Sequence, residues 1–140
     1  MTILLSSTVL GNATDDSELR ILVVDDDRDT ADTTAMLLKS PENQIRTAYD
    51  GVEAVREACE FRPDVIVLDI GLPKLNGYEV CRFIRKLPWG KNVIAIAVTG
   101  WGQARYQRWS EEAGFDRFLV KPVDPLTLLK VIAELACVKV

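Results

Sequence analysis

Three stretches of the chain are apolar without alternating with polar residues. They lie at 21–24, 65–68 and 93–98. This pattern is typical of strands that are covered on both faces, as in the interior of a parallel sheet. The stretch 44–49 instead mixes apolar and polar residues and predicts a half-exposed strand. A fifth strand is predicted at 115–120, where Asp116 and Arg117 interrupt the apolar residues.

Segments with helical spacing separate these strands. The predicted helices span 29–39, 52–61, 78–86, 101–113 and 125–136. Asp29 or Thr30 can cap the first helix, and Asp124 followed by Pro125 supplies a cap and first turn for the last. Gly114 stands where a left-handed residue is favoured after the fourth helix. The spacing predicts apolar faces formed by Ala31, Thr34, Ala35 and Leu38 on the first helix, and by Val52, Val55 and Cys59 on the second.

Strand and helix therefore alternate five times with short connections, which predicts a parallel sheet with right-handed crossovers. The first, third and fourth strands are apolar and belong inside the sheet, whereas the second and fifth carry polar residues and belong at its edges. The strand order 2-1-3-4-5 satisfies this division. It defines a flavodoxin-like, doubly wound α/β fold with helices on both faces. In this order the first and third strands are neighbours.

The length of 140 residues allows one domain with a sizeable core. We expect residues 1–18 to be a flexible N-terminal leader and residues 19–140 to form the domain. The leader has a short apolar run, but the run has no basic residues before it and is too short to span a bilayer. The sequence thus gives no reason to expect a membrane segment.

The net charge of −4 gives no electrostatic footprint for direct binding of nucleic acid or of a membrane surface. Small basic groups occur at Arg82, Arg85, Lys86 and Lys91 and at Arg105 and Arg108, and we interpret them as solvated helix faces. The cysteines at 59, 81 and 137 are far apart, and histidine is absent. This excludes histidine-dependent nucleophilic catalysis and a phosphohistidine on this chain, and it suggests neither a zinc site nor disulfides.

Acidic residues follow two of the strands that the predicted order makes neighbours. Asp25, Asp26 and Asp27 follow the first strand, and Asp69 ends the third. Taken alone, a strand-end Asp could simply cap the next turn. Several carboxylates at one sheet edge repel one another unless a cation binds or some pKa values rise. Oxygen donors in a shallow site favour Mg²⁺, since the sequence lacks the alternating acids of a calcium loop.

Two further strand ends add a hydroxyl and a cation. Thr99 ends the fourth strand, and Lys121 ends the fifth. Alone, Thr99 would be assigned to a turn and Lys121 to the solvated surface. Together with Asp69 they provide a nucleophilic carboxylate, metal ligands, a hydroxyl donor and a positive charge, which is the set that phosphoryl transfer requires.

These motifs resemble those of a known family. From residue 20 to about 136 the sequence is similar to the receiver domains of two-component response regulators, as VVDDD, LDIGLPKLNGYEV, AVTG and LVKPVD occur in the order and spacing of that family. The resemblance implies phosphorylation of Asp69 by a partner's phosphohistidine. It implies direct Mg²⁺ ligation by Asp26, Asp69 and the backbone carbonyl of Gly71, with Asp25 acting through water.

The resemblance also implies how the site responds to phosphorylation. Lys121 pairs with the phosphoryl group or with unmodified Asp69, Thr99 moves toward the phosphoryl oxygens, and Phe118 turns inward behind it. A cis peptide bond is expected between Lys121 and Pro122. The output surface is expected on the fourth helix, fifth strand and fifth helix, which could also support a homodimer. Asp27 has no assigned role, and we expect it to be either a bystander or a charge at a helix start.

Three positions limit the resemblance. Phe118 lacks the hydroxyl that many relatives carry, and Gly71 and Trp101 occupy positions that tune hydrolysis of the phosphoryl group in this family. The expected partners are a histidine kinase or histidine phosphotransfer protein and a downstream protein target, in the cytoplasm. Self-catalysed phosphorylation and hydrolysis at Asp69 would be its only enzymatic activity.

Three other functions compete with this interpretation. A receiver that only binds partners would be expected to lack Asp69 or Lys121. A phosphatase or phosphotransferase with an aspartyl nucleophile needs a second Asp two residues later, where this chain has Gly71. A flavin-binding protein of the same fold would place phosphate next to Asp25 and its neighbours, which would repel it.

Overall fold

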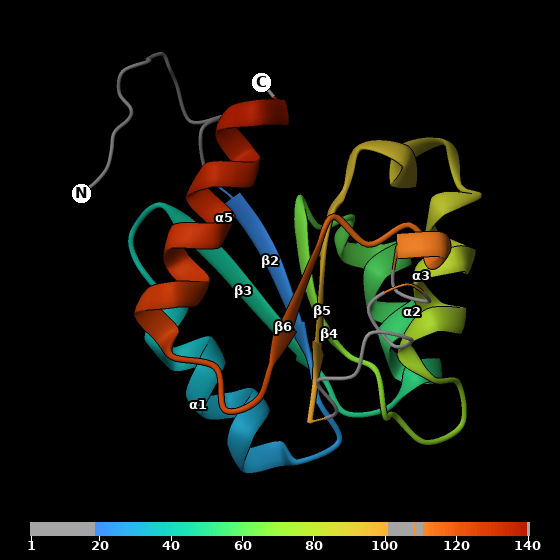
Figure 1. Cartoon of the computed structure of the whole chain (residues 1–140), viewed down its shortest axis with the longest axis horizontal. Coiled ribbons are helices and arrows are strands. Elements are labelled where there is room, and N and C mark those ends of the chain that lie inside the picture. The colour runs from blue at the N-terminus through green and yellow to red at the C-terminus, as the bar shows by residue number, and fades with distance from the viewer. Residues whose placement is uncertain (1–18, 101–107, 109–110, 140) are drawn as a thin grey trace.

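The structure is a computed structural model and describes residues 19–100, 108 and 111–139. Within this part of the chain, a five-stranded parallel sheet has the order β3-β2-β4-β5-β6 (Figure 1). Its strands are β2 (Leu19–Val24), β3 (Asn43–Ala48), β4 (Val65–Asp69), β5 (Ile94–Thr99) and β6 (Arg117–Val120). In sequence order this is 2-1-3-4-5, so the predicted flavodoxin-like topology is confirmed.

Burial follows the strand order. Every residue of β4 and β5 is buried, whereas β3 alternates between half-buried and exposed positions and ends on the buried Ala48. β6 is partly buried throughout until Val120, which is exposed. The two edge strands are therefore the two whose sequences mix polar and apolar residues. This agreement explains why the apolar pattern alone could predict the order.

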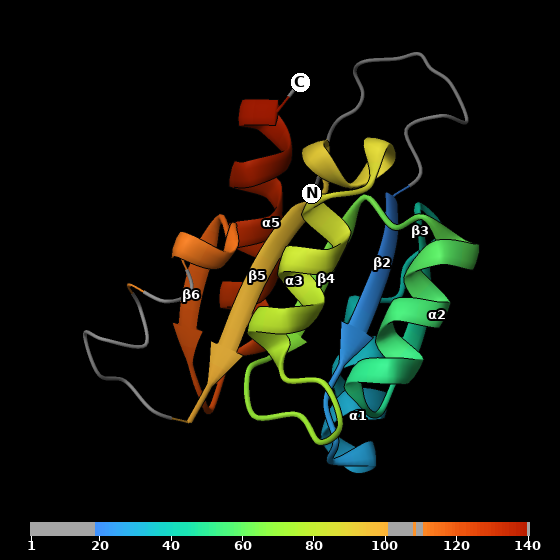
Figure 2. The same cartoon turned by 90° about the vertical axis from the view of Figure 1, so that its right-hand side faces the viewer.

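Helices cover both faces of the sheet. They are α1 (Arg28–Leu38), α2 (Gly51–Phe61), α3 (Gly77–Arg85), the 3₁₀ helix η3 (Pro88–Asn92) and α5 (Pro125–Lys139). α1 and α5 lie on one face, and α2 and α3 lie on the other (Figures 1 and 2). Most of the predicted helix 101–113 lies outside the described residues, although Arg108 and residues 111–113 are helical. The sequence analysis did not predict η3.

The sheet separates two apolar clusters. One lies between the sheet and α2–α3 and includes Leu22, Ile66 and Leu68, and the other lies against α1 and α5 and includes Ile21 and Ile96. Alternate residues of each inner strand thus enter opposite clusters, which is why these strands are apolar at consecutive positions. The cluster residues hold the carboxyl ends of the strands in place.

Val55 packs partly buried against the core as predicted, but Val52 and Cys59 are wrongly assigned to the apolar face of α2. Its buried residues are Gly51, Ala54, Ala58 and Phe61. Val52 is 45% exposed, and Cys59 is exposed as well. Gly51 packs closely against Leu75, because a Cβ added at Gly51 would lie 1.9 Å from the backbone carbonyl oxygen of Leu75. This close packing orients the small residues of α2 inward and turns Val52 outward.

The start of α1 also differs from the prediction. The N-cap is Asp27 rather than Asp29 or Thr30, and its Oδ1 accepts hydrogen bonds from the backbone N–H groups of both. Thr30 Oγ1 donates a further bond to Asp27 Oδ2 at 2.9 Å. These bonds to the ionised form lower the pKa of Asp27. The expectation that Asp27 acts as a charge at a helix start is thus confirmed.

Replacing Asp27 with Ala should lower the melting temperature, because two helix-start donors lose their acceptor. Asp27→Asn keeps an acceptor oxygen and serves as the matched control. Thermal unfolding followed by circular dichroism measures both variants. Equal melting temperatures for Asp27→Ala and the wild-type protein would contradict the capping role.

No helix among the described residues is long and apolar enough to cross a membrane. The three cysteines are free, with Cys81 buried in α3 and the other two exposed. Burial raises the pKa of the Cys81 thiol to about 11, so this side chain behaves as a packed apolar group.

Candidate functional site

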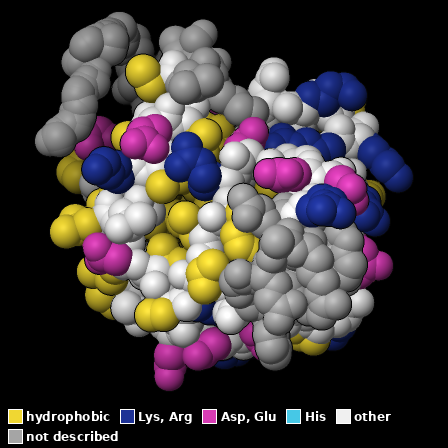
Figure 3. Space-filling view, viewed as in Figure 1, with side chains coloured by type: hydrophobic (Ala, Val, Ile, Leu, Met, Phe, Trp, Pro, Cys, Tyr) yellow, Lys and Arg dark blue, Asp and Glu magenta, His cyan; other side chains and the backbone are white. Residues whose placement is uncertain are grey.

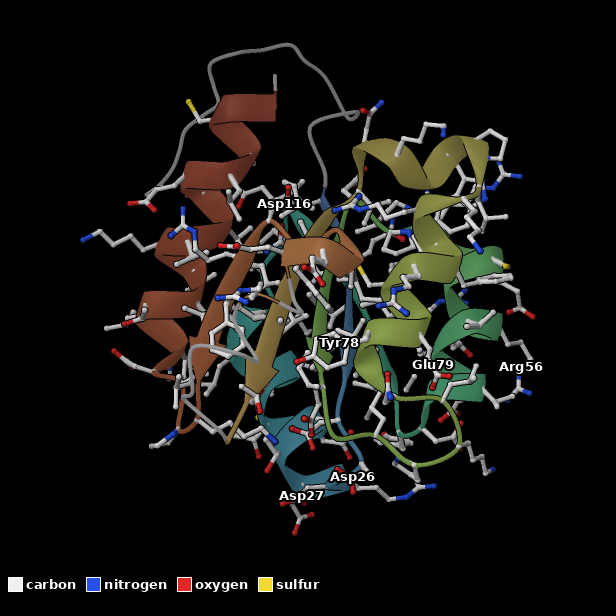
Figure 4. The ribbon with its side chains drawn as sticks, turned by 45° about the vertical axis from the view of Figure 1, so that its right-hand side comes forward. Asp26, Asp27, Arg56, Tyr78, Glu79 and Asp116 are labelled. Carbon is white, nitrogen blue, oxygen red and sulfur yellow. The ribbon has the colours of Figure 1, made fainter. Side chains whose placement is uncertain are left out.

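Carboxylates from two neighbouring strands meet at the carboxyl edge of the sheet. β2 and β4 pair in parallel, with Val24 opposite Leu68, so Asp25 and Asp69 lie side by side just beyond this pair. Asp25 is 5% exposed and Asp69 is 7% exposed. Asp26 is exposed, and Figure 4 shows it with Asp27 next to the start of α1. The predicted gathering of Asp25, Asp26 and Asp69 is confirmed, and we call this region the crevice.

Lys121 supplies the positive charge of the crevice. Its Nζ lies 3.0 Å from Asp25 Oδ2 and 3.0 Å from Asp69 Oδ2. Its backbone N–H donates to the carbonyl oxygen of Thr99 at 2.7 Å, so the end of β6 is held level with the end of β5. The predicted cis peptide bond between Lys121 and Pro122 is present. Lys121 is therefore an internal partner of the acids and not a solvated surface charge.

The pKa values in the crevice reflect burial and charge. Burial raises the pKa of Asp69, and the nearby charge of Asp25 adds to this effect, while hydrogen bonds from Lys121 and Gly71 oppose it. For Lys121, burial would lower the pKa, but hydrogen bonds to Asp25 and Asp69 outweigh it and the pKa is raised. At neutral pH the lysine is thus charged, and ionised Asp69 is held in a position that disfavours its charge.

Without metal, Asp69→Asn should therefore raise the melting temperature at pH 7. A carboxylate with a raised folded-state pKa binds protons more tightly when folded, so wild-type stability falls as pH rises above the ordinary Asp value of 3.8. A gain of about 1 kcal/mol corresponds to roughly 3 °C for a domain of this size. Melting curves at pH 7 and near pH 4 measure the gain, which should shrink at the lower pH. A gain that is larger at pH 4 would contradict this sign.

The residues present fit a divalent cation. Carboxylate oxygens of Asp25, Asp26 and Asp69 all lie within 4.8 Å of one another. Three carboxylates and one ammonium leave two negative charges uncompensated, and every donor is a hard oxygen. This donor set suits Mg²⁺, which binds through one or two carboxylates and keeps several waters. Asp26 is the exposed member of the group, so the site is open to solvent on its side.

The loops after β4 and after β2 each add one backbone donor to the crevice. The N–H of Gly71 donates to Asp69 Oδ1 at 3.0 Å, while the N–H of Asp27 donates to Asp25 Oδ1 at 3.0 Å. Each buried carboxylate therefore has one oxygen on a backbone N–H and the other on Lys121. This fixes the orientation of both carboxylates before any ligand binds.

Thr99 and Phe118 lie next to the crevice on β5 and β6. Thr99 ends β5 and is 1% exposed. Phe118 pairs with Ala97 and packs partly buried against the cluster beneath α2 and α3. Trp101 lies outside the described residues. The structure thus brings together Asp25, Asp26, Asp69, Gly71, Thr99 and Lys121, with Phe118 two residues before Val120 on the edge strand.

Two features were missed by sequence reasoning. A hollow of about 640 Å³ opens between α1 and α5 beside Asp25 and Lys121, lined partly by Thr30 and Thr34. The small residues on the inner face of α1 were its only sequence signal. The second feature is Arg85, which was predicted on a solvated face but is only 18% exposed at its side chain. Its partners include the carbonyl oxygen of Gly114 and the carboxylate of Asp116, which are 29 and 31 residues away in sequence, so no local pattern indicates them.

The strand order and an acidic crevice at the strand ends define a doubly wound α/β protein of the receiver type. The model of the response regulator receiver domain matches residues 21–133, so the chain belongs to this family. It is 31% identical over 105 residues to the DNA-binding dual master transcriptional regulator RpaA of Synechocystis. That match covers 75% of this chain and 44% of RpaA, so the chain spans less than half the length of that regulator.

Solved structures agree with this assignment. A CheY-like response regulator receiver domain protein from Methanospirillum hungatei has a TM-score of 0.81 and 30% identity, over 88% of this chain and 97% of that one. The receiver domain of the sensor histidine kinase PA1611 from Pseudomonas aeruginosa, solved with a magnesium ion in its active-site cleft, has a TM-score of 0.75 and 30% identity. The match covers 84% of this chain and 96% of that domain.

Proposed function

We propose that this receiver domain accepts a phosphoryl group on Asp69 from a partner's phosphohistidine. The single observation that carries the proposal is the position of Asp69, buried at a strand end with Lys121 Nζ 3.0 Å from its Oδ2. A carboxylate oxygen attacks phosphorus, the nitrogen–phosphorus bond breaks, and the partner's imidazole leaves with the bonding electron pair. The products are an acyl phosphate on Asp69 and an unphosphorylated histidine on the partner.

In this proposal each residue of the crevice has its own role. Lys121 neutralises charge on the phosphoryl oxygens, and the N–H of Gly71 keeps the Asp69 carboxylate oriented. Asp26, Asp69 and the backbone carbonyl of Gly71 hold Mg²⁺ directly, and Asp25 holds it through water. A bound Mg²⁺ supplies charge neutralisation for the phosphoryl oxygens. Self-catalysed transfer to Asp69 and later hydrolysis belong to the same proposal.

Phosphorylation would then change the surface near β6 and α5. The modification adds nearly two negative charges beside Thr99, whose hydroxyl would turn toward them. Phe118 would move inward behind Thr99, since it packs only partly buried against the cluster beneath α3. The resulting output surface would be formed by the segment after β5, by β6 and by α5, where a downstream protein or a second copy of the chain would bind.

The proposed partners follow from the chemistry. Histidine is absent from this chain, so the phosphoryl donor is a histidine kinase or histidine phosphotransfer protein. A cytoplasmic location is proposed because such phosphorelays operate there. We also propose that residues 1–18 form a leader and residues 19–140 form the receiver domain. The proposed binding partners are proteins rather than nucleic acid or a membrane.

The test is incorporation of a phosphoryl group from acetyl phosphate, a small phosphodonor. We expect one phosphoryl group per chain with Mg²⁺ and at least about tenfold slower labelling when EDTA removes it. Beryllofluoride, a phosphoryl mimic, should likewise bind only with Mg²⁺. Failure of both reagents with folded protein and excess Mg²⁺ would favour a receiver that only binds partners.

A further inference from the structure

A cluster around Arg85 lies at the end of the sheet opposite the crevice. Arg85 is the last residue of α3, and its guanidinium reaches the turn before β6. The Arg85 cluster consists of Arg85, Gly90, Val93, Gly114 and Asp116. In Figure 4, Asp116 lies at the upper end of the sheet, whereas Asp26 and Asp27 lie at the lower end. Lys and Arg side chains also gather over α3 and η3 in Figure 3, but Arg85 differs from solvated ones because it is largely buried.

All three guanidinium nitrogens of Arg85 donate hydrogen bonds. Nε and Nη2 donate to the carbonyl oxygen of Gly114 at 2.9 and 2.7 Å. Nη1 donates to the carbonyl oxygens of Gly90 and Val93, and Nη2 also reaches Asp116 Oδ2 at 3.0 Å. A planar guanidinium can make so many bonds at once only if its acceptors are fixed around it. The cluster therefore connects α3, η3 and the start of β5 to the chain that enters β6.

Asp116 connects the Arg85 cluster to strand β5 of the sheet. Its Oδ2 accepts from the backbone N–H of Ala95 at 2.9 Å, and its own N–H donates to the carbonyl oxygen of Ala95 at 2.8 Å. Asp116 is thus bound to β5 through both backbone and side chain. Gly114 has a φ of +102° and directs its carbonyl toward Arg85. A Cβ added at Gly114 would lie 3.0 Å from the Arg85 side chain.

This attachment matters because β6 is a short edge strand. It has four residues and pairs with β5 alone. A strand with so few pairs is weakly held in register, and a slip by one residue would exchange its two faces. The slip would also move Lys121 by roughly 3.3 Å along the strand. Lys121 Nζ lies 3.0 Å from Asp69, so a shift of that size would break the contact.

We infer that Arg85 is a positioning residue for the phosphoryl-acceptor site. Acting through Asp116, it fixes the register of β6 and thereby places Lys121 on Asp25 and Asp69. The metal ligands lie on β2, β4 and the following loop, so they do not depend on this register. This inference rests on the proposed function, and it predicts that loss of Arg85 separates phosphoryl acceptance from metal binding.

The test compares Arg85→Met with Arg82→Met, which removes an exposed arginine one turn earlier on the same helix. Labelling by acetyl phosphate should be about 100-fold slower in Arg85→Met, because even a displacement of about 1 Å, smaller than one register step, can have an effect of this size. Mg²⁺ affinity, from titration with the metal alone, should be equal to wild type or higher. Arg82→Met should match wild type in both. Asp116→Ala, which removes the acceptor oxygens, provides a second variant if Arg85→Met does not fold, and it should be slower in the same way.

A double-mutant cycle separates positioning from general stability. In a Lys121→Met background the Arg85→Met change should slow labelling no further, because its effect operates through Lys121. Three results would overturn the inference: wild-type labelling in folded Arg85→Met and Asp116→Ala, additive effects in the cycle, or a parallel loss of labelling and Mg²⁺ affinity. Absence of labelling in wild type and Arg82→Met would instead contradict the proposed function itself.

Discussion

Asp69→Asn is expected to abolish phosphoryl acceptance. The amide is nearly the same size as the carboxylate but is a poor nucleophile, so labelling by acetyl phosphate should fall by at least about 100-fold. The variant should remain folded, because removing a carboxylate whose pKa is raised by burial relieves charge repulsion with Asp25. Time courses with Mg²⁺, followed by intact mass, measure the effect.

Asp64→Asn is a matched control for this prediction. Asp64 is an exposed aspartate that precedes β4 at the opposite end of the strand from Asp69. It should be labelled at the wild-type rate. Labelling of Asp69→Asn at that same rate would mean that another group accepts the phosphoryl group and that Asp69 has a different role.

Lys121→Met should have the second largest effect. Methionine keeps the length and apolar stem of the side chain but removes the charge between Asp25 and Asp69. Loss of one charge-stabilising donor in such a site slows reaction by about 10²- to 10³-fold. The raised pKa of Lys121 also means that its pairing stabilises the fold at pH 7 and is lost only as pH rises through that value.

The variant should therefore be slower and less stable at neutral pH. The exposed Lys91 of η3 provides the control Lys91→Met, which should change neither property. Phosphorylation rates and melting temperatures of both variants, measured with Mg²⁺ in excess, test the prediction. A labelling rate for Lys121→Met within about twofold of wild type would exclude direct charge neutralisation by Lys121.

The strand order was predictable because burial acts on whole strands. The apolar runs that became β2, β4 and β5 indicated interior strands, and the mixed stretches that became β3 and β6 indicated edges. From that order the meeting of Asp25 and Asp69 follows without side-chain information. The contact between Lys121 and both acids also agreed with the expected position of Lys121 at a strand end.

Other features depend on contacts that sequence spacing does not encode. Val52 and Ala54 lie on nearly opposite faces of α2, and the packing of Gly51 against Leu75 favours burial of the face with Ala54. Arg85 belongs to an apparently basic surface, but its acceptor in Gly114 is 29 residues away. Such long-range backbone contacts arise only when the chain has folded.

The central claim is that Asp69 accepts the phosphoryl group, and its most direct test is to locate that group. The protein is labelled by acetyl phosphate with Mg²⁺, digested under conditions that preserve acyl phosphates, and analysed by mass spectrometry of the fragments. We expect a single modified residue, Asp69, and at least about tenfold slower modification when EDTA is present. A phosphoryl group on any other residue, with Asp69 unmodified, would contradict the mechanism proposed for this site.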